Sequence, residues 1–106
     1  MLTINETPTF VAEAARIWSD DERLEYFAWI GRNPEVGTAI PGSGGCRKVR
    51  WLRSGAGKQG GTRVIQVAQQ PAGELWMLLV YAKTVRDDIP GHILRQVRRV
   101  LEDDRR

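Results

Sequence analysis

The chain is poor in the side chains that most often bind transition metals. Its 106 residues include one cysteine, Cys46, and one histidine, His92. A structural zinc site takes roughly four nitrogen or sulfur ligands, and no run of acidic residues has the spacing of a calcium loop. We therefore expect no metal site and no cofactor. A single cysteine also excludes a disulfide within the chain, which agrees with a reducing compartment.

The chain also lacks the marks of a triad hydrolase, a membrane protein or a secreted protein. No serine sits in a nucleophile elbow, and His92 falls in a predicted helix as an exposed residue. No apolar run reaches the length of a membrane span, and no basic-then-apolar signal peptide opens the sequence. We expect one domain over residues 1–106, located in the cytoplasm and without a membrane partner.

Acidic residues are missing from one long segment. Residues 36–73 contain no Asp or Glu, while the rest of the chain has 13 acidic and 10 basic residues. The basic residues of that segment are Arg47, Lys48, Arg50, Arg53, Lys58 and Arg63. Concentrated positive charge favours contact with phosphate, and RNA is the partner we weigh first. A solvated β-hairpin with a glycine-rich tip explains the charge equally well.

The apolar pattern predicts an α+β fold. Alternation over residues 2–5 indicates a strand, and helices follow with caps at Thr9 and Ser19, the latter with capping-box spacing to Glu22. Strands over 46–53, 62–69 and 75–81 form a three-stranded antiparallel meander, preceded by a loop over 37–45. A C-terminal helix begins near Pro90, and we expect all helices on one face of the sheet. The expected apolar positions of the helices are Phe10, Ala14, Ile17, Leu24, Phe27, Ala28 and Ile30, then Ile93, Val97, Val100 and Leu101.

The basic side chains suit metal-independent cleavage of RNA. Such a reaction needs a base for the 2′-hydroxyl, an acid for the leaving oxygen and cations for the phosphate. Lysine can transfer protons, whereas arginine clamps phosphate with paired donors and serves poorly as a base. Strand alternation places Lys48 and Arg50 on one face, with Arg47 on the other. The four tryptophans, at positions 18, 29, 51 and 76, are expected in the core.

Three blocks of the sequence together resemble the RelE/HigB toxins of bacterial toxin–antitoxin pairs, most of all the HigB-type members. They are Gly44 to Trp51 (GGCRKVRW), Gly55 to Ile65 (GAGKQGGTRVI) and Leu78 to Lys83 (LLVYAK). The resemblance covers nearly the whole chain and implies a small RelE-like fold. It also implies a ribosome-dependent endoribonuclease, an mRNA interferase that enters the vacant A site and cuts the message by 2′-hydroxyl attack. Its partners would be mRNA, the ribosome and an inhibiting antitoxin with a helix-turn-helix domain.

The same resemblance assigns roles to individual residues. Arg63 matches the arginine that contacts the scissile phosphate, and Lys48 and Arg50 match the basic strand positions, with Lys48 as the proton-transfer candidate. Tyr81 and Lys83 match a block that stacks on or positions RNA. We expect Arg47, Arg53 and Lys58 to add contacts to RNA, with Arg47 and Arg53 otherwise solvated or facing the antitoxin.

Two departures from the family pattern leave other functions open. Gln66 and Val67 stand where relatives have aromatic residues, and the C-terminal stretch has His92 but no tyrosine. The general base is therefore not identified. The alternatives to cleavage are a ParE-like inhibitor of gyrase and a decayed toxin that only binds its antitoxin.

Overall fold

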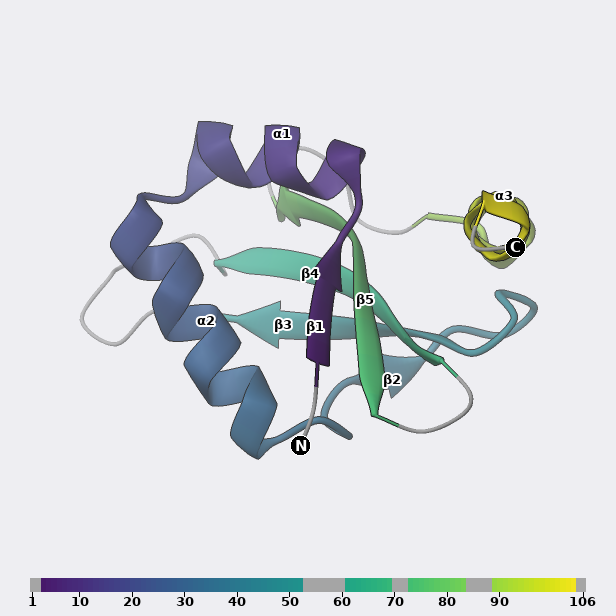
Figure 1. Cartoon of the computed structure of the whole chain (residues 1–106), viewed down its shortest axis with the longest axis horizontal. Coiled ribbons are helices and arrows are strands. Elements are labelled where there is room, and N and C mark those ends of the chain that lie inside the picture. The colour runs from purple at the N-terminus through teal and green to yellow at the C-terminus, as the bar shows by residue number, and fades with distance from the viewer. Residues whose placement is uncertain (1–2, 53–60, 70–72, 84–88, 105–106) are drawn as a thin grey trace.

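The computed structural model of the protein describes residues 3–52, 61–69, 73–83 and 89–104. Strand, two helices, meander and helix follow one another as the sequence predicts, with one further short strand, β2, inside the segment predicted to be a loop (Figure 1). The elements are β1 (Thr3–Glu6), α1 (Pro8–Ile17), α2 (Asp20–Arg32), β2 (Thr38–Ala39), β3 (Cys46–Trp51), β4 (Thr62–Gln69), β5 (Glu74–Ala82) and α3 (Gly91–Asp104).

The strands form one mixed sheet in the order β1-β5-β4-β3-β2. β3, β4 and β5 make the predicted antiparallel meander, and β2 extends it at the β3 edge. β1 pairs in parallel with β5, so that Thr3 lies beside Glu74. The hydroxyl of Thr7 donates to the carbonyl of Leu78 (3.1 Å), and the Glu13 carboxylate accepts from the Val80 amide (3.2 Å). The first elements of the chain are thus anchored to its last strand.

Side-chain caps set the starts of the first two helices. Ser19 and Glu22 form the predicted capping box, in which each side chain bonds the other residue's backbone amide at 3.1 Å. The cap predicted at Thr9 is wrong. Thr7 is the N-cap of α1, because its hydroxyl accepts from the Phe10 amide and Pro8 fits the first helical position, where no amide hydrogen is needed.

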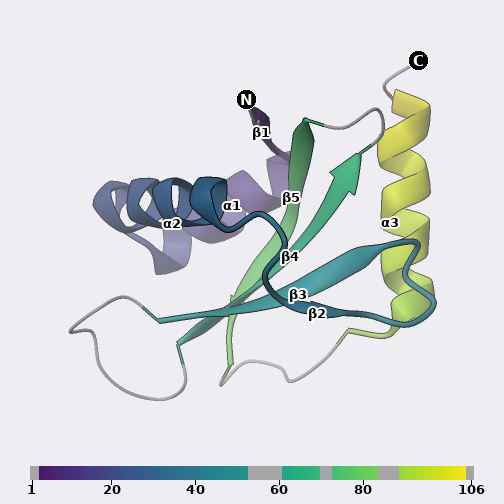
Figure 2. The same cartoon turned by 90° about the horizontal axis from the view of Figure 1, so that it is seen from below.

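The helices lie on both faces of the sheet, which corrects the expectation of a single covered face. α1 and α2 pack on one face, here called the helix-pair face, and α3 packs on the other, here called the α3 face (Figure 2). In α3 the buried side chain is Leu94, with Val97 half-buried, whereas Ile93 is 41% exposed. The predicted stripe is therefore wrong at Ile93 and confirmed at Val97, and the side chains of residues 100–104 lie outside the described part.

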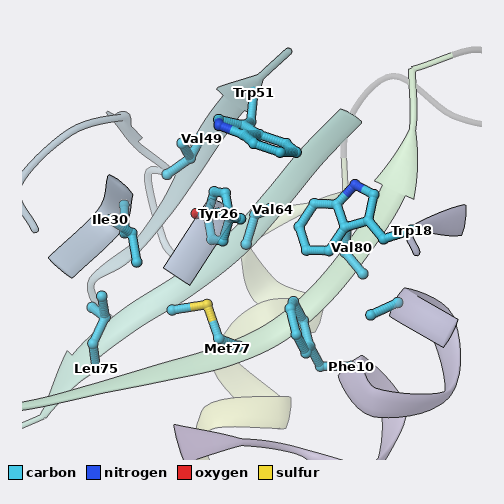
Figure 3. Packing of buried hydrophobic residues seen from close by; sticks show 11 residues of the cluster. Phe10, Trp18, Tyr26, Ile30, Val49, Trp51, Val64, Leu75, Met77 and Val80 are labelled. Carbon is cyan, nitrogen blue, oxygen red and sulfur yellow. The ribbon is translucent and has the colours of Figure 1, made fainter. Parts of the chain in front are cut away.

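The core of the helix-pair face is rich in aromatic rings. Phe10, Trp18, Tyr26 and Trp51 are buried together, with ring centroids 5.3–6.1 Å apart in the contacting pairs (Figure 3). The Tyr26 hydroxyl donates to Gln66 Oε1 at 2.7 Å, which pairs a buried polar group of α2 with one of β4. Leu24 and Ile17, predicted to be apolar contacts of the helices, are instead 59% and 37% exposed.

Candidate nucleic-acid interface

Three of the predicted site residues form one row across the sheet. In the strand register Arg50 of β3 lies opposite Arg63 of β4, and Arg63 lies opposite Tyr81 of β5. Side chains directly opposite one another project from the same face, with Cβ atoms about 5 Å apart. Tyr81 belongs to the apolar cluster beneath α3, so the row lies on the α3 face. The meander therefore brings two arginines and a tyrosine within about 10 Å of one another.

Lys48 and Lys83 flank this row. Lys48 precedes Arg50 by two residues on β3 and so shares its face, opposite Ile65 of β4. Lys83 follows the end of β5, and its backbone amide donates to the carbonyl of Gly61 at 3.3 Å. That bond fixes the turn after β5 beside the start of β4. All five residues predicted to be catalytic thus come from adjacent positions of three neighbouring strands and their ends.

These five residues differ sharply in exposure. Arg50 and Lys83 are exposed and Lys48 is half-buried, whereas Arg63 and Tyr81 are only 6% and 5% exposed. A guanidinium nitrogen of Arg63 also donates to the carbonyl of Thr62 at 3.3 Å. Burial and this bond restrict the conformations of the Arg63 side chain, so its guanidinium has a defined orientation. Arg50 and Lys83 are therefore more accessible to a solute than Arg63.

A cavity of about 270 Å³ adjoins Lys48. Its walls are mostly apolar and come from β2, the residues after it, β4 and the segment before α3: Thr38, Ala39, Ile40, Pro41, Ile65 and Ile89, with Lys48. The sequence did not indicate this cavity, because its lining residues are scattered over 50 positions of the chain and none carries a chemical signature. The turn that builds one wall is held by Ser43, whose hydroxyl donates to the Ile40 carbonyl and accepts from the Cys46 amide.

The remaining predicted RNA contacts do not join this row. Arg47 alternates with Lys48 and Arg50 and lies with Val49 and Trp51 toward the helix-pair face, where its guanidinium donates to the Gly37 carbonyl at 3.0 Å. Arg53 and Lys58 lie outside the described residues. The structure therefore separates Arg47 from the five residues predicted to be catalytic.

Cys46 and His92 lie apart from the row. Cys46 is buried, and this burial raises the pKa of its thiol, with opposing effects from the Ser43 hydrogen bond and the nearby Arg98 charge. A protonated buried thiol is a poor nucleophile. His92 is exposed in the first turn of α3, as predicted. Within the described residues no three histidine, cysteine or acidic side chains gather as metal ligands, and no helix is long and apolar enough to cross a membrane.

This arrangement of strands and helices is a RelE-like fold, which confirms the predicted fold class. The chain is similar to the solved structure of the E. coli toxin RelE, an arginine-to-alanine double mutant in the free state. The match has a TM-score of 0.61 and 14% sequence identity, over 93% of this chain and 97% of that one. No family model matches the sequence. At this level of identity the structural match shows the fold alone.

Proposed function

We propose that this protein is the toxin of a toxin–antitoxin pair and cleaves mRNA in the ribosomal A site, most like the HigB-type toxins. The row Arg50–Arg63–Tyr81 with Lys48 beside it carries the proposal, since it gathers cations and a tyrosine on one face of a RelE-like fold. Cations arranged around one point stabilise the charge that develops on a phosphate during transfer.

The reaction is a transfer within the RNA strand. The 2′-hydroxyl oxygen bonds to the adjacent phosphorus while the bond from that phosphorus to the next 5′-oxygen breaks. The products are a 2′,3′-cyclic phosphate and a free 5′-hydroxyl. One proton leaves the 2′-oxygen and one joins the 5′-oxygen, so the sum of protons is unchanged and no redox step or metal is required.

Each residue of the site has a distinct part in this proposal. Arg63 donates to the phosphate as its charge grows, and the exposed Arg50 attracts and holds the same group. Lys48 transfers a proton at the edge of its apolar cavity. Tyr81 and Lys83 position the RNA at the β5 end of the row.

The proposed partners would supply what the cationic row does not. The row gives affinity for phosphate without reading bases. A ribosome with an empty A site would hold the message in line for attack. An antitoxin, which we expect to be a helix-turn-helix protein, would block this face between episodes of activity.

Two experiments test the proposal. Inducing the protein alone and mapping mRNA 5′ ends should reveal cuts within translated reading frames. The purified protein should cleave a message on a programmed ribosome with a vacant A site much faster than the same message free in solution. Equal rates would point to a self-sufficient nuclease. Intact messages with inhibited gyrase would point to the ParE-like activity instead.

A further inference from the structure

A second, larger groove lies between α2 and the end of β3. Its volume is about 460 Å³, and its lining residues are Glu25, Ala28, Trp29, Arg32, Arg50, Trp51 and Leu52. β2 pairs only with Arg47 and Lys48, so among the described residues no strand lies beside the rest of β3 at this edge. Arg50 stands at this open edge and belongs both to the cationic row and to the groove.

The groove combines an aromatic wall with positive charge. Trp29 is half-buried, and its ring packs near Tyr26 at a centroid distance of 6.0 Å, which holds the indole in place. The side chains of Arg32 and Arg50 are exposed. Grooves that pair exposed cations with aromatic rings bind single-stranded nucleic acid, because bases stack on the rings while phosphates contact the cations.

We propose that this groove holds a nucleotide of the substrate RNA next to the scissile one, with its base against Trp29 and its phosphate at Arg32 and Arg50. The inference rests on the proposed function and extends its site around the β3 edge. Continuity through Arg50 favours the same RNA strand over a separate ligand. The volume lies within the roughly 300–1,000 Å³ of small-ligand sites, which leaves room for one nucleotide.

Charge and hydrogen-bonding capacity agree with this occupant. Arg32 and Arg50 outnumber Glu25, the single carboxylate in the lining. A carboxylate repels phosphate and accepts hydrogen bonds from the amino groups of adenine, cytosine and guanine. The phosphate is therefore assigned to the arginines and not to the side of the groove that carries Glu25.

Binding of RNA oligomers of two lengths tests the inference without any cleavage. The probes carry one 2′-deoxy sugar at the scissile position, and the longer ones extend by two nucleotides on the 5′ side or on the 3′ side. Wild-type protein should bind one of the longer probes about 10-fold more tightly than the short one, as expected for one stacked base. Ala28→Glu, on an exposed helix position in the groove, should remove this gain, and any loss of short-probe affinity through the shared Arg50 should be smaller.

Two further variants make the result specific. Ala12→Glu is the matched control, because Ala12 is an equally small exposed residue of α1 that lines none of the described cavities. It should keep the gain. Stacking should also quench tryptophan fluorescence on binding of the longer probe, and Trp29→Phe, which retains a ring against Tyr26, should abolish that quenching.

The outcomes separate this inference from the proposed function. Equal affinity of the wild type for both probe lengths, with unchanged Trp29 emission, overturns the inference while short-probe binding at the row still stands. Failure to bind either probe overturns both. If Ala28→Glu spares the length dependence but releases the antitoxin, the groove is a protein interface and the assignment to RNA is wrong.

Discussion

The two faces of the sheet are packed with different kinds of side chain. The helix-pair face is covered by α1 and α2 and is rich in aromatic rings, and the buried Tyr26 hydroxyl donates to Gln66 Oε1 across it at 2.7 Å. The α3 face is mostly aliphatic beneath α3, with Tyr81 and Trp76 as its aromatic members, and it carries the cationic row toward the end of β3 that α3 does not reach (Figure 2). One face is committed to stability. The other combines packing with the residues proposed to act on RNA, so substitutions on the two faces should have separable effects.

Arg63→Ala is expected to separate an effect on cleavage from an effect on stability most strongly. Removing one donor to a developing oxyanion costs roughly 3–4 kcal/mol of transition-state stabilisation, a loss of about 10²- to 10³-fold in cleavage on the ribosome. Arg63→Lys should restore only part of the rate, because lysine lacks the paired planar donors. Because Arg63 is 6% exposed, urea unfolding of both variants is the required control. Full cleavage by a folded alanine variant would remove Arg63 from the site.

The converse experiment removes a buried hydrogen bond from the helix-pair face alone. Tyr26→Phe removes the donor to Gln66 Oε1 and leaves that buried oxygen without its partner, which should lower the free energy of unfolding by about 1–3 kcal/mol. Cleavage per folded molecule should not change. Adding Gln66→Leu to Tyr26→Phe should recover part of the loss, since both polar groups are then gone. A fall in specific cleavage activity would mean that the two faces are coupled.

Rising alkaline pH should lower the free energy of unfolding in two steps, one from a buried group on each face. Burial raises the pKa of Tyr26 and of Cys46 above their ordinary values of 10.0 and 9.0. Above those values the unfolded chain releases protons that the folded chain keeps, so stability is complete at neutral pH and falls as pH rises, first near 9 and then near 10. Each group contributes up to about 1.4 kcal/mol per pH unit. Chemical unfolding at pH 7, 9 and 10.5 measures this. Cys46→Ala should remove the first decline and Tyr26→Phe the second.

The smallest effect is expected at Arg47. Arg47→Gln should change stability by less than about 0.5 kcal/mol and should leave cleavage unaltered, because this side chain lies away from the row and bonds the Gly37 carbonyl. Arg50→Gln, three residues further along the same strand, should reduce cleavage and weaken its dependence on salt. Equal losses in the two variants would contradict the division between faces.

Local signals in the sequence predicted much of this structure. The capping box at Ser19 and the alternation that puts Arg47 opposite to Lys48 and Arg50 depend on residues a few positions apart, and both are confirmed. The Arg50–Arg63–Tyr81 row follows from the meander once its register is known. The chemical roles proposed for the residues of that row remain predictions.

Other features depend on contacts that no local pattern encodes. Leu94 rather than Ile93 faces the sheet, and α3 begins at Gly91, where an added Cβ would meet the Pro41 carbonyl, a contact between distant segments. The placement of helices on both faces depends on which face of the sheet α3 packs against after β5. The groove beside Arg50 exists only because β2 ends early and α2 passes nearby, and the composition of neither element indicates it.

The parallel pairing of β1 with β5 determines the order in which the chain can fold during synthesis. β1 finds its neighbour about 70 residues later, and α1 is bonded to the same strand through Glu13 and Val80. While the first half of the chain emerges from the ribosome, β1 has no strand to pair with, and α1 lacks its bond to β5. Contacts of such long range are formed slowly, after a large loss of chain entropy. We therefore expect the nascent protein to remain unfolded, and without its cationic row, until β5 has left the exit tunnel.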